Sequence, residues 1–208
     1  MAGKDLIALV ADKNMEFALR ALLSRAASLE IRPVTADVYV HPERDAGCLL
    51  RAHEFCRPFI DRYSHSLVMF DREGCGRGQE SRRELEQRTE ALLSNFGWEG
   101  RSATVVIDPE LEAWVWSSSP HVASALGWQG RRPGLREWLE RVDLWADAEA
   151  KPHRPKHALE RALWAVRRPR SSALYAEIAG KVRLGDCQDL AFGKLRDTLA
   201  SWFQRHGR

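Results

Sequence analysis

The sequence predicts an α/β protein with a mostly parallel sheet of about four strands, helices on both faces and an all-helical C-terminal region. Two observations lead to this class. Short apolar runs alternate with amphipathic helical patterns in the first half of the chain, and the strand pattern is absent from about residue 120 onward. Strands that are apolar on both faces are typical of parallel sheets with a helical layer on each side.

The first predicted strand is 6–10, where every residue is apolar. The other strands are expected at 34–40, 67–70 and 104–107. Between them lie three helical patterns: 14–27 with Asn14 as a cap, 46–63 with a bend at Pro58, and the charged segment 79–95. Asp108 and Pro109 are the residue types of a helix cap and a first turn, so a further helix is expected to begin there.

The second half of the chain reads as helices at 134–142, 156–168, 171–180 and 187–204. The segment 151–156, Lys-Pro-His-Arg-Pro-Lys, resembles a connector because it holds two prolines. We therefore expect an α/β domain over residues 1–118 and a helical region over 119–208 that is basic from residue 151.

Composition excludes several classes of protein. Eight Trp and seven Phe argue against a disordered chain. The longest wholly apolar run, 6–11, is too short for a membrane helix, and the N-terminus lacks an apolar signal stretch, so a cytoplasmic protein is expected. The four cysteines form no Cys-x-x-Cys pair, which favours reduced thiols over zinc or disulfides. Neither a P-loop nor a Gly-x-Ser-x-Gly elbow is present.

Charge is unevenly distributed along the chain. Residues 1–150 carry 19 Lys and Arg against 24 Asp and Glu, a net charge of −5, whereas residues 151–208 carry 13 against 5, a net charge of +8. An acidic body beside a basic region suggests a metal or catalytic face next to a surface that binds a polyanion. The alternative is a basic helical surface that contacts only water.

Acidic residues follow three of the predicted strands. Asp12 and Glu16 follow the first, Asp71 and Glu73 the third, and Asp108, Glu110 and Glu112 the fourth. Sites of open parallel sheets lie at the carboxyl ends of the strands, and crowded carboxylates repel one another unless a cation neutralises them. Such oxygen ligands suit Mg²⁺ or Mn²⁺.

Each acid also has a structural interpretation. Asp12 and Asp108 stand where helix caps belong, Glu110 is favoured by the dipole of a helix start, and Asp71 and Glu73 can form an ordinary polar loop. Glu110 and Glu112 cannot both point inward from a regular helix, because residues two apart lie about 200° around it. Glu112 is the preferred member of that pair.

These motifs resemble the Toprim domain of topoisomerases, primases and overcoming-lysogenization-defect nucleases. The resemblance rests on the acid after the first strand, the Asp71-x-Glu73 pair and the alternation of strands and helices. Asp108-Pro109-Glu110-Leu111-Glu112-Ala113-Trp114 is similar to a motif of small bacterial Toprim-like proteins, and segments 156–159 and 172–179 resemble their C-terminal helices. Toprim usually has Glu-Gly after the first strand, whereas this chain reads Val10-Ala11-Asp12-Lys13-Asn14.

The resemblance implies a Toprim-like (Rossmannoid) fold and a nuclease or effector subunit of an anti-phage system with an ABC-type or AAA-type ATPase partner. The leading hypothesis is a Mg²⁺- or Mn²⁺-dependent nuclease acting on DNA or RNA. Asp71 and Glu73 would bind the ion with Asp12 or Glu16, and Glu112, or less favourably Glu110, would complete the site. The residues expected to grip the phosphate backbone are Arg154, Lys156, Arg167, Arg168 and Arg170.

Two other hypotheses remain open at this point. The changed first motif favours a Toprim-like subunit that has lost catalysis and docks on a partner protein or nucleic acid. A metal-dependent phosphohydrolase for small substrates fits less well, because it gives the basic region no role.

Overall fold

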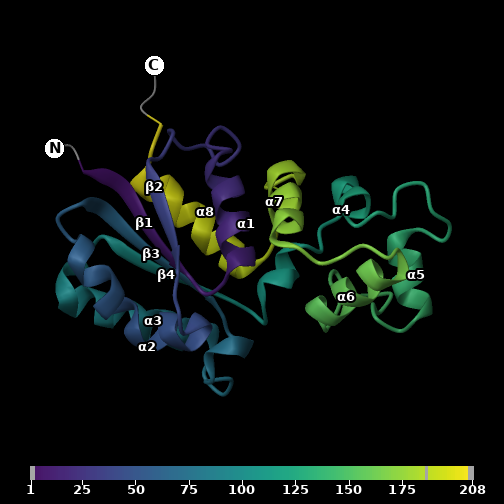
Figure 1. Cartoon of the computed structure of the whole chain (residues 1–208), viewed down its shortest axis with the longest axis horizontal. Coiled ribbons are helices and arrows are strands. Elements are labelled where there is room, and N and C mark those ends of the chain that lie inside the picture. Colours follow the sequence, from purple (N-terminus) through teal and green to yellow (C-terminus); the bar gives the residue numbers. More distant parts are fainter. Residues whose placement is uncertain (1–2, 186, 206–208) are drawn as a thin grey trace.

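The computed structural model describes residues 3–185 and 187–205. Its centre is a sheet of four strands that all run parallel, in the order β2-β1-β3-β4 (Figure 1). The strands are β1 (Lys4–Val10), β2 (Ala36–Val40), β3 (Tyr63–Asp71) and β4 (Ser102–Ile107). The predicted α/β class, with a parallel sheet and a helical C-terminal region, is confirmed.

The two inner strands are buried on both faces, as their uninterrupted apolar sequences require. Residues 6–10 of β1 and 67–70 of β3 are each at most 1% exposed. Ala8 lies between Val38 of β2 and Leu67 of β3 in the register of the sheet. The inner strands therefore fix the positions at which their carboxyl ends deliver polar residues.

Helices cover both faces of this sheet (Figure 1). The helices α2 and α3 pack on one face, α1 and α8 on the other, and α7 packs against the outside of α1. Their bounds are α1 (Lys13–Leu23), α2 (Arg44–Cys56), α3 (Arg82–Leu93), α7 (Ser172–Lys181) and α8 (Leu190–Trp202). The last two helices of the chain thus lie on the same side of the sheet as the first helix.

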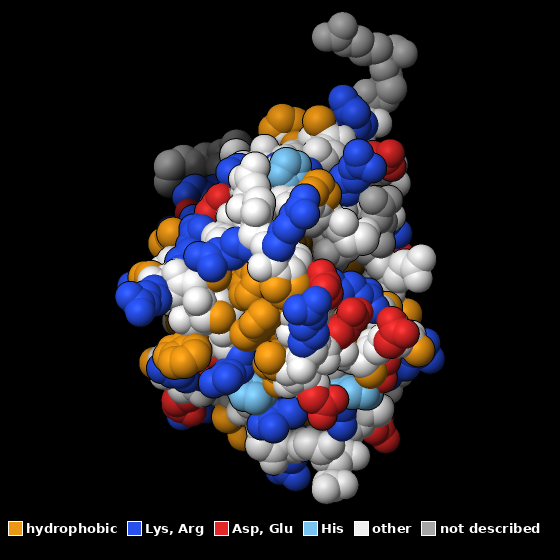
Figure 2. All heavy atoms as spheres, turned by 90° about the vertical axis from the view of Figure 1, so that its right-hand side faces the viewer, with side chains coloured by type: hydrophobic (Ala, Val, Ile, Leu, Met, Phe, Trp, Pro, Cys, Tyr) orange, Lys and Arg blue, Asp and Glu red, His pale blue; other side chains and the backbone are white. Residues whose placement is uncertain are grey.

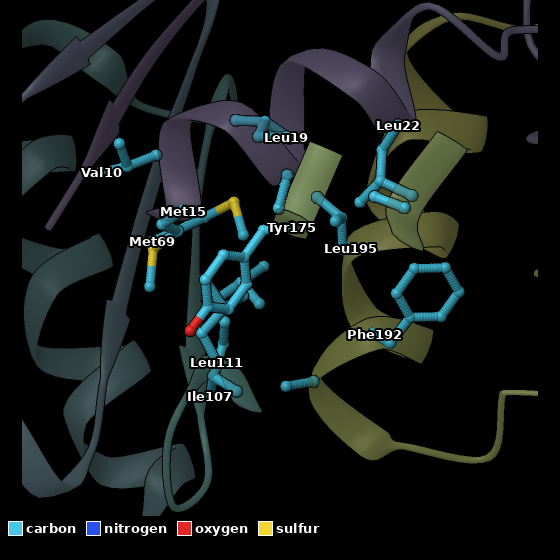
Figure 3. Packing of buried hydrophobic residues seen from close by; sticks show 14 of the residues in the cluster. Val10, Met15, Leu19, Leu22, Met69, Ile107, Leu111, Tyr175, Phe192 and Leu195 are labelled. Atoms are coloured by element: carbon cyan, nitrogen blue, oxygen red, sulfur yellow. The ribbon is translucent and has the colours of Figure 1, made fainter. Parts of the chain in front are cut away.

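The remaining helices extend the molecule at one end, on the right in Figure 1. They are α4 (Pro120–Ala125), α5 (Leu135–Arg141) and α6 (Pro155–Ala165). One cluster of buried apolar residues runs through the sheet and these helices without a break. Figure 3 shows part of it, where the ring of Tyr175 from α7 lies beside Met15, Met69 and Leu111. The core is therefore not divided at residue 118.

Several expected elements differ from the structure. The helix expected from Asp108 is wrong: Glu110 is extended (φ −159°, ψ 164°), and only a short 3-10 turn, η4 (Leu111–Trp114), follows. The helix expected over 46–63 ends at Cys56, and a 3-10 turn, η1 (Arg57–Phe59), contains Pro58 before β3 begins. Helix α4 was not predicted. Within the described residues, no helix is both long and apolar enough to cross a membrane.

Candidate functional site at the carboxyl edge of the sheet

Acidic side chains from all four strand ends lie at the carboxyl edge of the sheet. Asp71 is the last residue of β3, and Asp12 caps α1 directly after β1. Asp45 lies in the first turn of α2, after β2. Glu110 and Glu112 follow β4 and are 7% and 2% exposed. The shared edge arises because parallel strands all end on the same side.

Asp71 lies at the centre of this group. Burial raises the pKa of the Asp71 carboxyl well above its usual range, and neighbouring carboxylates raise it further, in decreasing order Asp45, Glu112, Asp12 and Glu110. Its Oδ1 atom is shielded from solvent and has no hydrogen-bond partner among the described residues. A buried oxygen without a partner is unusual and needs either a proton or a cation to compensate it.

Asp45 is a member of the site that the sequence reasoning missed. Its Oδ1 accepts a hydrogen bond from the backbone N–H of Asp71 at 2.8 Å. A Cβ atom at Gly74 would lie 2.4 Å from Oδ2 of Asp45, so a larger residue there would displace the Asp45 side chain. Burial, together with Asp12, raises the pKa of Asp45. The sequence does contain the pattern that would identify it: Asp45 follows the second predicted strand, as the other acids follow the first, third and fourth.

Glu112 is held by two donors from the loop before α7 and from α7 itself. Arg170 donates from Nη2 to its Oε1, and the hydroxyl of Tyr175 donates to the same oxygen at 2.5 Å. Burial and the Glu112 carboxylate raise the pKa of Tyr175, which keeps its proton available for this bond. In Figure 3 the Tyr175 hydroxyl points toward the side of the core where Ile107 and Leu111 lie. The charge of Glu112 is thereby compensated within the protein.

Glu110 borders an open pocket on the other side of η4. Its Oε1 accepts the backbone N–H of Lys156 at 2.9 Å, at the start of α6, and burial raises its pKa. The pocket has a volume of about 340 Å³ and is also lined by Glu73, Arg154 and Lys156. Glu73 is exposed there, and its charge raises the pKa of Glu110 further.

Of the acids Asp12, Glu16 and Asp108, only Asp12 is a neighbour of Asp71. Asp12 is both the N-cap of α1, through a 2.9 Å bond from the N–H of Met15, and a neighbour of Asp71. Glu16 instead forms an ion pair with Arg20 at 2.9 Å. Asp108 pairs with Arg72 at 2.9 Å. Of the two acids after the first strand, the structure therefore brings Asp12, not Glu16, to the site.

The basic residues expected to bind phosphates divide into three groups. Arg154 and Lys156 line the pocket beside Glu110. Arg167 and Arg168 line a separate depression at the end of α6. Arg170 is engaged by Glu112 and also by Glu160, at 3.1 Å. Lys156 also pairs with Glu110 at 3.9 Å, and Arg168 pairs with Glu177 at 3.2 Å. Among the described residues, Arg154 and Arg167 therefore form no ion pair.

The number of carboxylates at this edge that could bind a hard divalent cation is small. Over residues 3–185 and 187–205, no group of three or more His, Cys, Asp or Glu side chains is arranged to hold a metal ion. Mg²⁺, however, is commonly held by only one or two carboxylates, with water and substrate phosphate as the other ligands. Asp71, with its unpartnered oxygen, and the neighbouring Asp45 are the two carboxylates that could hold such an ion.

Comparison of the chain with protein-family models, with curated protein sequences and with solved structures found no match.

Proposed function

We propose that this chain is a nuclease-like subunit that binds Mg²⁺ or Mn²⁺ at the carboxyl edge of the sheet and acts on nucleic-acid phosphodiesters. The observation that carries the proposal is Asp71: a carboxylate oxygen without a partner, shielded from solvent and surrounded by four other acids. A protein buries such a group at a considerable cost in stability, and perturbed carboxylates of this kind concentrate at functional sites.

Asp71 and Asp45 are the proposed ligands, with Asp12 as their nearest further acid. A divalent ion held there would supply the Lewis-acid chemistry that phosphodiester hydrolysis needs. Lys156 and Arg154 line the adjacent pocket and would bind the phosphate on either side of the scissile bond. Arg170 and Tyr175 fix Glu112, and so position the η4 turn that forms one wall of the site.

The direct test is cleavage of labelled DNA and RNA strands by purified protein with Mg²⁺, with Mn²⁺ and with EDTA. Cleavage is expected only with a divalent ion. Asp71→Asn should reduce the rate by about a hundredfold or more, because a displaced ligand misplaces the reacting groups. Glu16→Gln is the matched control, since Glu16 also follows β1 but pairs with Arg20. Equal rates for wild type and Asp71→Asn would refute the nuclease activity.

A second candidate is a subunit that binds nucleic acid without cutting it. The observation in its favour is that Glu110 and Glu112 are already engaged by Lys156, Arg170 and Tyr175. This candidate expects binding without cleavage under every metal condition, and binding by Asp71→Asn equal to that of wild type. The ATPase partner and the anti-phage setting rest on the Toprim resemblance alone and stay predictions.

A further inference from the structure

Trp164 differs from the other tryptophans of the chain by its exposure. The chain has eight tryptophans, all within the described residues. Trp164 is 72% exposed, whereas the other seven are buried or half-buried. Exposing an indole ring gives up about 2 kcal/mol of burial free energy relative to placing it in the core. A ring held out in this way is a candidate contact for a partner.

The exposure follows from the position of Trp164 on α6. The inner face of this helix consists of Ala158, Leu159, Ala162 and Leu163, all at most 2% exposed. Trp164 lies one and four positions from Leu163 and Glu160, on the outward face that also carries exposed Arg161. The ring therefore cannot reach the core without rotation of the helix.

Positive charge surrounds the ring. The guanidinium carbon of Arg161 lies 5.2 Å from the centroid of the Trp164 ring, so this cation covers one face of the indole. Arg167 and Arg168 line the depression next to it. Among the described residues, Arg161 and Arg167 form no ion pair, while Arg168 pairs with Glu177 at 3.2 Å. Figure 2 looks onto this end of the molecule, where Lys and Arg side chains border hydrophobic ones.

We propose that Trp164, Arg161 and Arg167 form a binding surface for single-stranded nucleic acid. A base would stack on the open face of Trp164, and the flanking phosphates would contact the two arginines. A single strand fits better than a duplex, because only an unpaired base can present the face of its ring to an exposed aromatic side chain. The inference rests on the proposed function only in taking nucleic acid as the ligand, and it requires neither a metal ion nor cleavage.

Helix α6 joins this surface to the candidate active site. Lys156, at its first turn, lines the pocket beside Glu110, and Trp164 lies eight residues further along. Eight residues of α-helix span about 12 Å, which corresponds to roughly three or four stacked nucleotides. A strand that stacks on Trp164 can therefore place a phosphate near Lys156. The surface would present single-stranded substrate to the acidic edge of the sheet.

The test is binding of fluorescent 20-mers of dT, of rU and of duplex DNA, measured by anisotropy in EDTA so that cleavage cannot interfere. Wild type should bind at least one of the single strands more tightly than the duplex. Trp164→Ala should weaken that binding about tenfold or more, and Trp164→Phe should retain part of it. Leu190→Ala is the control, because Leu190 is 73% exposed but lies on α8, and it should bind as wild type does.

The salt dependence of binding distinguishes the contribution of the Trp164 ring from that of the arginine charges. Arg167→Ala should make the slope of log K against log salt shallower by about 0.7, while Trp164→Ala should leave the slope unchanged. Tighter binding of duplex, or unchanged single-strand affinity in Trp164→Ala, would overturn the proposal. Absence of binding by wild type to all three probes would overturn it as well. If the wild-type protein binds single strands but does not cleave them, only the nuclease function is refuted.

Discussion

Glu112 shows how a single buried carboxylate is stabilised in this protein. It is 2% exposed, and its partners Arg170 and Tyr175 lie 58 and 63 positions further along the chain. Removing one partner of a buried ion pair leaves an uncompensated charge. Arg170→Ala is expected to lower the free energy of unfolding by about 2 to 4 kcal/mol, measured by urea denaturation.

An exposed ion pair provides the comparison for Arg170. Arg141 and Glu137 form an i,i+4 pair whose side chains are 63% and 55% exposed. Arg141→Ala should change the free energy of unfolding by less than about 0.5 kcal/mol. Equal effects of the two substitutions would contradict the structural role assigned to Arg170.

Asp5 gives a prediction about acid stability. Hydrogen bonds from Arg32 at 2.6 and 3.0 Å, opposed by partial burial and assisted by Thr35, lower the pKa of Asp5. A carboxyl whose pKa is lowered on folding stabilises the protein above its unfolded pKa of about 3.9, and this contribution is lost as pH falls further. Asp5→Asn should therefore cost about 1 kcal/mol at pH 7, and less as pH falls from about 5 to about 2.

The measurement is the free energy of unfolding as a function of pH. Asp61→Asn, at an exposed carboxylate, is the control and should follow the pH dependence of wild type. A difference between wild type and Asp5→Asn that stays constant with pH would show that the carboxylate charge is not the source of the stabilisation.

Part of the candidate site was predictable at the residue scale. Asp12, Asp71, Glu110 and Glu112 follow strands, and a parallel sheet brings strand ends together, so their proximity follows from local sequence and topology. Glu73, expected to bind the ion with Asp71, lies in the 3-10 turn after β3 and is exposed. Sequence alone could not show which acids are already neutralised, because Arg170 and Lys156 reach them from distant segments.

At the scale of elements, α3 begins with a two-sided N-terminal cap. Ser81 accepts the N–H of Glu84 at 3.3 Å, and Glu84 accepts the N–H of Ser81 at 2.7 Å, which forms a capping box. Ser81→Ala should lower the free energy of unfolding by about 1 kcal/mol, since it leaves a helix N–H without its acceptor.

The control for this prediction is Ser201→Ala. Ser201 is exposed within α8, where alanine is the better helix former, so stability should be unchanged or slightly higher. Chemical denaturation of both variants measures whether the cap stabilises the protein. A Ser81→Ala variant as stable as wild type would show that the cap does not stabilise α3.

Strand positions were predicted more reliably than helix ends. Every predicted strand forms, because a short apolar run between polar turns has few alternatives in a parallel sheet. The helix expected at Asp108 fails because the Glu110 carboxylate turns toward the N-terminus of α6, a contact that no local pattern encodes. Helix α2 is shorter than expected because the chain must turn at residues 57–59 to enter β3.

At the scale of the whole molecule, the parallel sheet was predictable but the return of the chain onto it was not. Helices α7 and α8 pack on α1 and β4, so residues from both halves share one core. Thermal unfolding should accordingly be a single transition, with the same midpoint by circular dichroism at 222 nm and by tryptophan fluorescence. Two transitions, one for residues 1–118 and one for the remainder, would contradict a common core.

We propose above that Asp71 holds a divalent ion at the carboxyl edge of the sheet. The most direct measurement is titration of Mn²⁺ into the purified protein by calorimetry. Wild type and Glu16→Gln are expected to bind Mn²⁺ with the same affinity, and Asp71→Asn should bind it about tenfold or more weakly. Unchanged affinity in Asp71→Asn, or no Mn²⁺ binding by wild type, would contradict the account.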